Sequence, residues 1–178
     1  MASIDVADSG VQSALSALAE KLDNLGPCLK EIGEDIGERA TQRFATSTGP
    51  DGQPWKANAA ATINAYVASK NGFGKKGLTK KGLALQVGKK PLIATRGLSR
   101  SIRYQIINGG QGVEIGTNRF ADKIPGGAAI HQFGGQAGRG NKVTIPARPF
   151  LPIKQNGDMY ALDQAMVLAT INAYLAEK

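Results

Sequence analysis

The sequence predicts an α+β fold: N-terminal amphipathic helices and a C-terminal helix packed on a small antiparallel β-sheet, with a long Gly/Lys-rich loop or arm. Two observations lead to this prediction. Apolar residues recur at helical spacing near both ends of the chain, and short stretches between them alternate apolar and polar residues. The order of helices, strands and helix is typical of helices that cover one face of an antiparallel sheet. We expect one domain over residues 1–178, with residues 68–92 as a flexible basic arm.

Two apolar stripes predict the N-terminal helices, at about residues 10–25 and 27–46. The stripes comprise Val11, Leu15, Leu18, Leu22 and Leu25, and then Leu29, Ile32, Ile36, Ala40 and Phe44, with Cys28 on the same face. Gly26-Pro27 separates them, since Gly suits a helix end and Pro a first turn. The alternative is one helix kinked at this step. Helices lying on a sheet are the favoured explanation of the stripes, and a coiled-coil seam is the alternative.

A turn is expected after the second helix. Pro50-Asp51-Gly52 has turn chemistry, because Pro fixes φ, Asp bonds its own backbone and Gly adopts a positive φ. Trp55 is expected to close this turn against the core. A short Ala-rich helix is expected at residues 57–69.

The second half of the chain predicts a hairpin, further short elements and the last helix. Ile102, Tyr104 and Ile106 alternate with polar residues, as do Val113 and Ile115 beyond a Gly-rich turn. Residues 128–134 fit a short strand or a helical turn, and residues 142–145 a strand ended by prolines. Apolar spacing predicts a helix at about residues 158–177, with Asp158 as its cap.

Composition excludes several classes of protein. One cysteine allows no disulfide framework and no cysteine-based zinc site. No apolar run approaches the roughly 20 residues of a membrane span, and the N-terminus lacks the order of a signal peptide. We expect a soluble protein made and used in a reducing cytoplasm, with no membrane partner.

The net charge of +8 is unevenly distributed along the chain. Residues 1–55 carry nine acids and four bases, a net of −5; residues 56–113 carry eleven bases and no acid; residues 114–178 carry seven bases and five acids. Contact between the acidic N-terminal helix of one copy and the basic residues 56–113 of a neighbouring copy explains this charge distribution at least as well as DNA binding does. The candidate partner-binding lysines of the arm are Lys75, Lys76, Lys80, Lys81, Lys89 and Lys90.

No catalytic or cofactor site is expected. His131 is the single histidine, it has no Ser or Cys beside it, and a hydrogen-bonded structural role is the favoured interpretation. Ligands are not clustered at metal-site spacing, and the glycine runs lack the phosphate-loop pattern. Arg96, Arg100 and Arg103 suit either phosphate contact or carboxylate pairing between subunits.

Four ordered segments resemble the virion morphogenesis family of tailed bacteriophages, which includes tail-completion proteins of Mu-like phages. They are Arg43-Phe44 followed by Pro50 to Trp55, then Thr95-Arg96-Gly97-Leu98 to Ile102, then Val113 to Thr117 with Ile130-His131-Gln132-Phe133-Gly134, and finally Ile145-Pro146-Ala147-Arg148-Pro149-Phe150-Leu151. The resemblance covers about residues 30–175, and the basic arm departs from it.

The resemblance implies a structural protein of the phage neck that completes the tail and joins it to the head. It implies a ring of copies, hexameric in the simplest case, around the DNA channel. Partners would be the tail tube or tail terminator and head-connector proteins, with possible backbone contact to packaged DNA. Gly97 is expected to serve a tight strand start, and His131-Gln132 to bridge that strand to the Pro146–Phe150 segment. The alternatives are a nonspecific nucleic-acid-binding protein that uses residues 56–113, and an assembly chaperone absent from the finished particle.

Overall fold

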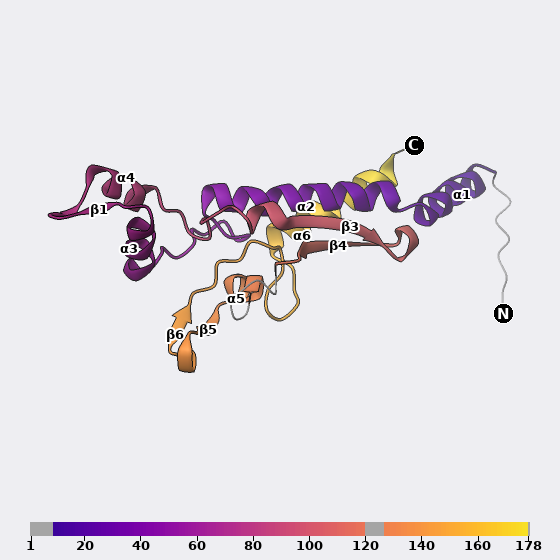
Figure 1. Ribbon diagram of the computed structural model, residues 1–178. Coiled ribbons are helices and arrows are strands. Elements are labelled where there is room, and N and C mark those ends of the chain that lie inside the picture. Colours follow the sequence, from indigo (N-terminus) through magenta and orange to yellow (C-terminus); the bar gives the residue numbers. More distant parts are fainter. Residues whose placement is uncertain (1–8, 120–126, 178) are drawn as a thin grey trace.

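The computed structural model describes residues 9–119 and 127–177, which form mixed helix and strand as predicted (Figure 1). The helices in these ranges are α1 (Ser9–Asp23), α2 (Gly26–Thr46), α3 (Ala60–Ser69), α4 (Lys80–Gly88), α5 (Gly127–Phe133) and α6 (Ala161–Ala176). The strands are β1 (Phe73–Gly74), β2 (Gly77–Leu78), β3 (Ile102–Ile107), β4 (Gly112–Thr117), β5 (Gly135–Ala137) and β6 (Val143–Ile145). Within the described residues the strands pair as three separate two-stranded antiparallel sheets, so the expected single small sheet is divided.

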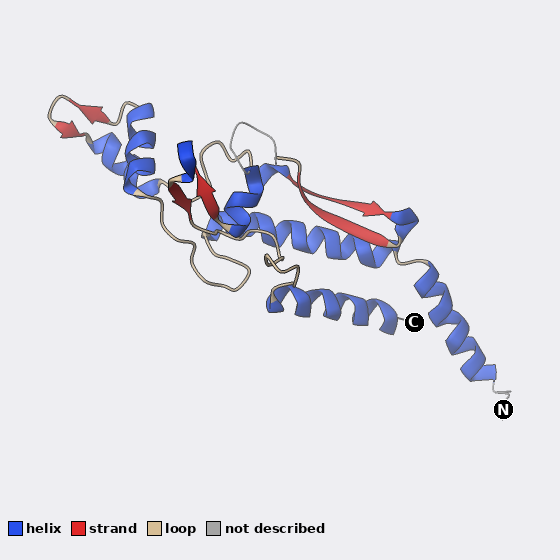
Figure 2. Cartoon of the chain, turned by 90° about the horizontal axis from the view of Figure 1, so that it is seen from below, coloured by secondary structure: helices blue, strands red, loops and turns tan. Residues whose placement is uncertain are grey.

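Helix α2 is the centre of the molecule, with the β3–β4 hairpin on one side and α6 on another (Figure 2). Its buried Cys28, Ile32 and Ile36 pack against Val113 and Ile115 of β4, and against side chains of α6 that include Met166, Val167 and Ile171. Because neighbours cover α2 on more than one side, its apolar stripe is buried as the sequence predicted.

The break between the first two helices is real. Pro27 lies in the first turn of α2, where its missing N–H costs nothing, and α1 ends three residues before Gly26. Two helices are therefore confirmed, and a single kinked helix is not found. The predicted stripe on α1, however, has no buried residue. Helix α1 projects beyond the body of the molecule and lies on no sheet (Figure 1).

The predicted hairpin is confirmed in its register. Ile102 pairs with Thr117, Tyr104 with Ile115 and Ile106 with Val113 across the Asn108–Gly110 turn. A methyl group on Gly33 of α2 would lie 2.5 Å from a ring carbon of Tyr104. Glycine at this position therefore lets the hairpin approach the helix closely.

A second core lies where α2 ends. It comprises Ala40, Phe44, Trp55, Ile102, Ala128 and Phe150. The rings of Phe44 and Trp55 meet edge to face with centroids 5.4 Å apart, and Phe44 and Phe150 are 5.3 Å apart. Such pairs add about 0.5–1.5 kcal/mol each to the burial of their area.

Residues 60–88 form a folded lobe, so the stretch expected as a Gly/Lys-rich loop or arm contains the regular elements β1, β2 and α4. Helix α3, the β1–β2 hairpin and α4 pack together around Val67, and Thr79 caps α4 by accepting from the Gly82 N–H at 3.0 Å. A methyl group on Gly82 would lie 2.0 Å from the Gly72 carbonyl oxygen. Gly72 and Gly82 therefore let two backbone segments approach each other closely. In the sequence they stand only as spacers between lysines. The flexibility of residues 68–92 stays a prediction.

The remaining elements follow the sequence with one correction. Residues 128–134 adopt the helical alternative as α5, and the expected strand at 142–145 is β6, paired with β5. Asp158 does not cap α6, which begins at Ala161. Its carbonyl oxygen instead accepts from the Lys154 N–H at 2.8 Å, and the Tyr160 N–H donates to Pro152 at 2.9 Å. This turn delays the start of the helix.

Candidate functional site

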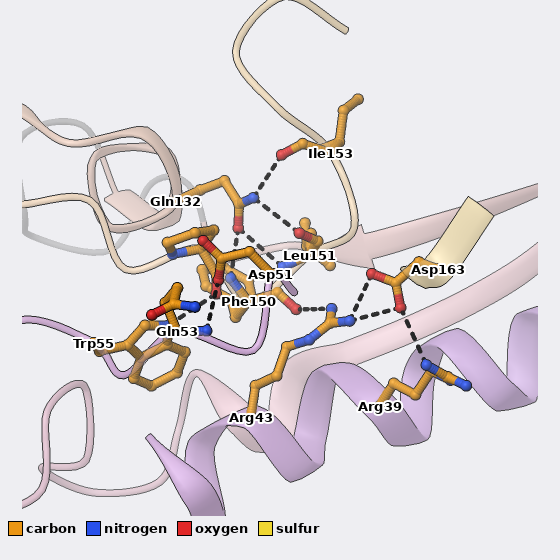
Figure 3. Close-up of polar contacts among 11 residues, drawn as sticks. Arg39, Arg43, Asp51, Gln53, Trp55, Gln132, Phe150, Leu151, Ile153 and Asp163 are labelled. Atoms are coloured by element: carbon orange, nitrogen blue, oxygen red, sulfur yellow. Dashed lines mark hydrogen bonds and ion pairs between the residues drawn. The ribbon is translucent and has the colours of Figure 1, made fainter. Parts of the chain in front are cut away.

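Gln132 organises the segment that follows Pro149 (Figure 3). Its side-chain oxygen accepts from the backbone N–H groups of Phe150 and Leu151, each at 2.9 Å. Its amide nitrogen donates to the carbonyls of Leu151 and Ile153 at 3.0 and 2.8 Å. This buried side chain thus satisfies four backbone groups in a region without regular pairing. Gln132 therefore joins α5 to residues 150–153, whereas the bridge was expected to reach the strand after Gly97.

The predicted turn after α2 places Trp55. The Gly52 N–H donates to the Gly49 carbonyl at 3.0 Å, and the Asp51 carboxylate accepts from the Gln53 N–H at 3.0 Å. Gly52 has a φ of 76°, the positive value that the sequence required. The Trp55 side chain is buried, and its Nε1–H donates to the Pro149 carbonyl at 3.0 Å. Trp55 therefore fastens the turn to the second core and to the Pro149 carbonyl, and Pro50 is buried within the turn.

An ion pair joins α2 to α6 beneath this segment. Both carboxylate oxygens of Asp163 accept from Nη2 of Arg43 at 2.6 Å, and Arg43 Nη1 donates to the Phe150 carbonyl at 2.9 Å. Arg39 lies 3.7 Å from the same carboxylate (Figure 3). Asp163 is fully buried and Arg43 nearly so. The pair fixes the relative position of three segments that are far apart in the sequence.

Arg148 also points into the protein. Its Nε and Nη2 donate to the carbonyls of Lys56 and Ala57 at 2.8 and 2.9 Å, and its backbone N–H donates to the His131 carbonyl at 2.7 Å. The hydrogen-bonded role expected for His131 is not seen at Nδ1, which is buried without a hydrogen-bond partner in the part of the chain that the structure describes. Burial, together with the charge of Arg148, lowers the pKa of His131 below its usual value of 6.5.

Gly134 follows α5 in a conformation that favours glycine. Its φ is 77°, and a methyl group there would lie 3.0 Å from the Ala147 nitrogen. Phe133 is partly exposed. Pro146 is half-buried, in the segment that passes beside Gly134.

The Arg96-Gly97-Leu98 segment leads into a 3-10 turn over Ser99–Ser101, so Gly97 does not begin the strand directly. Leu98 packs on the second core, and Arg96 is exposed with a φ of 61°. Beside it lies an open cavity of about 520 Å³, lined by Thr95, Gly97, Arg100, Ser101, Arg103, Asn118 and Arg119. This cavity gathers three guanidinium groups and suits an anion.

The six candidate lysines of the arm divide into two groups. Lys89 lies over the Tyr66 ring at 4.8 Å from its centroid and donates to the Ile93 carbonyl, and Lys90 donates to Ala45 at 2.6 Å. Lys90 thus attaches the chain after the lobe to the end of α2, and Lys89 attaches it to Tyr66 of α3. The other four, which are Lys75, Lys76, Lys80 and Lys81, are exposed and form no ion pair with a described residue. They remain accessible to a partner.

Sequence reasoning missed Asp163 and Gly33. No local pattern marks either residue, since their partners lie 120 and 71 positions away. Within residues 9–119 and 127–177 no group of three or more His, Cys, Asp or Glu gathers as a metal site. None of the described helices is both long enough and apolar enough to span a membrane.

Comparison with known proteins identifies the family. The sequence profile of the phage virion morphogenesis family matches residues 6–176. The chain belongs to this family. It is similar to "Mu-like prophage FluMu G protein 2" of Haemophilus influenzae (strain ATCC 51907 / DSM 11121 / KW20 / Rd), with 37% identity over 135 residues, which is 76% of this chain and 86% of that protein. No solved structure matches the chain. As a member of the virion morphogenesis family, it has a structural or morphogenetic role in a phage particle.

Proposed function

We propose that the chain is a non-enzymatic subunit of the phage neck, which completes the tail and joins it to the head as a ring of copies around the DNA channel. The proposed ring contains six copies of the chain. The match of residues 6–176 to the virion morphogenesis family carries this proposal. The motif residues support it, since Trp55, Gln132, Arg148 and Phe150 fix the backbone from within. A ring subunit needs such a rigid frame, because each interface must repeat with the same angle.

The test is a cryo-electron microscopy reconstruction of the particle, together with deletion of the gene. We expect a ring of density at the head-proximal end of the tail that fits this fold. The deletion should leave separate heads and tails, and supply of the chain in trans should restore joined particles. Infectious, joined particles from the deletion, or a neck without the chain, would overturn the proposal. Need for the chain without its presence in particles would identify an assembly chaperone.

Nonspecific nucleic-acid binding is the second candidate function. The acid-free stretch 56–113 and the arginine-lined cavity favour it. Replacing Lys75, Lys76, Lys80 and Lys81 with Gln should then weaken duplex DNA binding. The slope of log K for binding against log salt concentration should also become less negative, by about 0.9 for each phosphate that is no longer neutralised. Unchanged binding in this variant would exclude the four lysines as the DNA-binding residues. Lys89 and Lys90 are unsuitable for this test because they support the lobe.

A further inference from the structure

Helix α1 exposes its entire apolar stripe. Val11, Leu15, Leu18 and Leu22 are 45%, 60%, 41% and 53% exposed, and no residue of this 15-residue helix is buried. Their spacing places them on one helical face. An isolated helix of this length is marginal in water, and an amphipathic helix normally gains its stability by packing that face. The side chains of Leu15, Leu18 and Leu22 therefore form an apolar surface that residues 9–119 and 127–177 leave about half exposed.

The direction of α1 is set by the end of α6. Lys21 Nζ donates to the Tyr174 carbonyl at 2.7 Å and lies 5.5 Å from the centre of that ring, and the Tyr174 hydroxyl donates to the Asn24 carbonyl. The helix is thus attached at its C-terminal end and projects from one end of the molecule (Figure 1). The lobe of α3, β1, β2 and α4 occupies the other end in both views (Figures 1 and 2).

The lobe also exposes apolar side chains. Leu83 and Val87 are one turn apart on α4 and are 55% and 81% exposed. Phe73 and Leu78 stand opposite each other in the β1–β2 hairpin and are 45% and 42% exposed. Large exposed apolar groups with charged residues around them are typical of protein contact sites.

The charges of the two ends are opposite. The lobe carries the accessible Lys75, Lys76, Lys80 and Lys81, and the sequence has no acid between residues 56 and 113. Residues 9–36, which comprise α1 and the first half of α2, carry five acids and two bases, and their exposed acids include Asp23 and Glu31 near the junction of α1 and α2. Opposite charge attracts the lysine-bearing end of one copy to the acidic end of another.

We infer that the apolar stripe of α1 docks on the lobe of the next copy of this chain, so that the α1 end of each subunit contacts the lobe end of its neighbour. The contact is heterologous, because a different surface of each copy takes part, and it closes into a ring when its rotation closes. This inference rests on the proposed function and names the interface of the proposed ring. It assigns a role to the basic segment that the family motifs leave out.

Cross-linking of single cysteines tests the docking. Leu15→Cys and Val87→Cys are both exposed changes, and native Cys28 is buried with its pKa raised by burial, so it reacts slowly. Particles carrying both changes in one chain, treated with a short bis-maleimide, should give a ladder of oligomers. Particles with the two changes on separate chains should give dimers only. Ser13→Cys, on the far side of α1, replaces Leu15→Cys as the matched control and should give little product with Val87→Cys.

The outcomes separate the interface from the proposed function. Cross-linked dimers from Leu15→Cys alone would show that α1 pairs with α1 of another copy, and would overturn the inference. Absence of any ladder in particles that contain the chain would overturn the inference while leaving the neck proposal intact. Absence of the chain from purified particles would overturn both.

Discussion

Asp163 is the residue whose loss should cost the most stability. It is 0% exposed, and its removal leaves the buried Arg43 guanidinium without a carboxylate. Breaking a buried pair from one side typically costs about 3–5 kcal/mol. We expect Asp163→Ala to lower the free energy of unfolding by this amount in urea denaturation monitored by circular dichroism.

Two further variants control this prediction. Asp158→Ala removes an exposed carboxylate just before the same helix and should change the free energy of unfolding by less than about 1 kcal/mol. The double change Arg43→Met with Asp163→Leu removes both charges together, so it should cost less than Asp163→Ala alone. A loss below about 1 kcal/mol in Asp163→Ala would contradict the structural role of the pair.

His131 should make the protein sensitive to mild acid. Its pKa is lowered in the folded state by burial and by Arg148, so the unfolded chain binds the proton more readily. The free energy of unfolding should therefore be highest above the unfolded pKa of about 6.5 and should fall as the pH decreases below it. His131→Gln should show a smaller fall between pH 7 and 5 when urea midpoints are compared. An identical fall in both proteins would assign the acid sensitivity to other groups.

Residue-scale prediction succeeded where the contact is local in the sequence. Pro50, Asp51 and Gly52 were assigned to a turn from their own conformational preferences, and Trp55 to its closure. The partners of Arg43 and Gln132 were beyond reach. A buried ion pair or a side-chain amide that satisfies distant backbone groups leaves no periodic pattern, so only the folded chain shows it.

At the scale of elements, the contact of α2 with the hairpin depends on Gly33. Gly33→Ala would place a methyl group 2.5 Å from the Tyr104 ring, which must shift. Overpacking of this kind costs about 1–3 kcal/mol. Gly37→Ala is the matched control, since it lies one turn further along α2 with nothing within 4 Å of the added methyl, and it should stabilise the helix by up to about 1 kcal/mol. Thermal melts of both variants check the prediction, and a Gly33→Ala protein as stable as Gly37→Ala would contradict it.

Elements were predictable where one periodicity dominates. The apolar stripe of α2 predicts a helix, and the alternation in β3 and β4 predicts strands. Residues on one buried face recur every 3.6 positions in a helix and every 2 in a strand. Within the lobe α3 was predicted, whereas the β1–β2 hairpin and α4 were missed because their packing rests on the approach of Gly72 to Gly82, which no side chain marks. The start of α6 was placed early because Met159 continues the apolar spacing of Leu162 and Met166, although it lies in a turn, paired with Ile153.

At the scale of the whole molecule, stability and assembly should separate. Leu15→Glu with Leu18→Glu alters a helix that buries nothing, so the free energy of unfolding should change by less than about 1 kcal/mol. The same change places carboxylates in the inferred contact and should abolish incorporation into particles, measured by immunoblot. Ser13→Glu with Ser16→Glu adds the same charge away from the stripe and should leave incorporation intact. Incorporation of the Leu15→Glu, Leu18→Glu protein at the wild-type level would contradict a role for the stripe.

The opposite charges of the two ends should govern how fast copies join. Purified chain is expected to be monomeric in solution, as mass measurement can verify, and to assemble on tails from a deletion mutant. Lys80→Glu with Lys81→Glu turns part of the basic end acidic, so its association with such tails should be slower than that of the wild type. Raising the salt from about 50 to about 300 mM shortens the screening length and should slow the wild type toward the variant, while the apolar contact keeps dissociation similar. Equal association rates at low salt would show that charge does not guide the copies together, and the basic middle of the chain would then act on another partner.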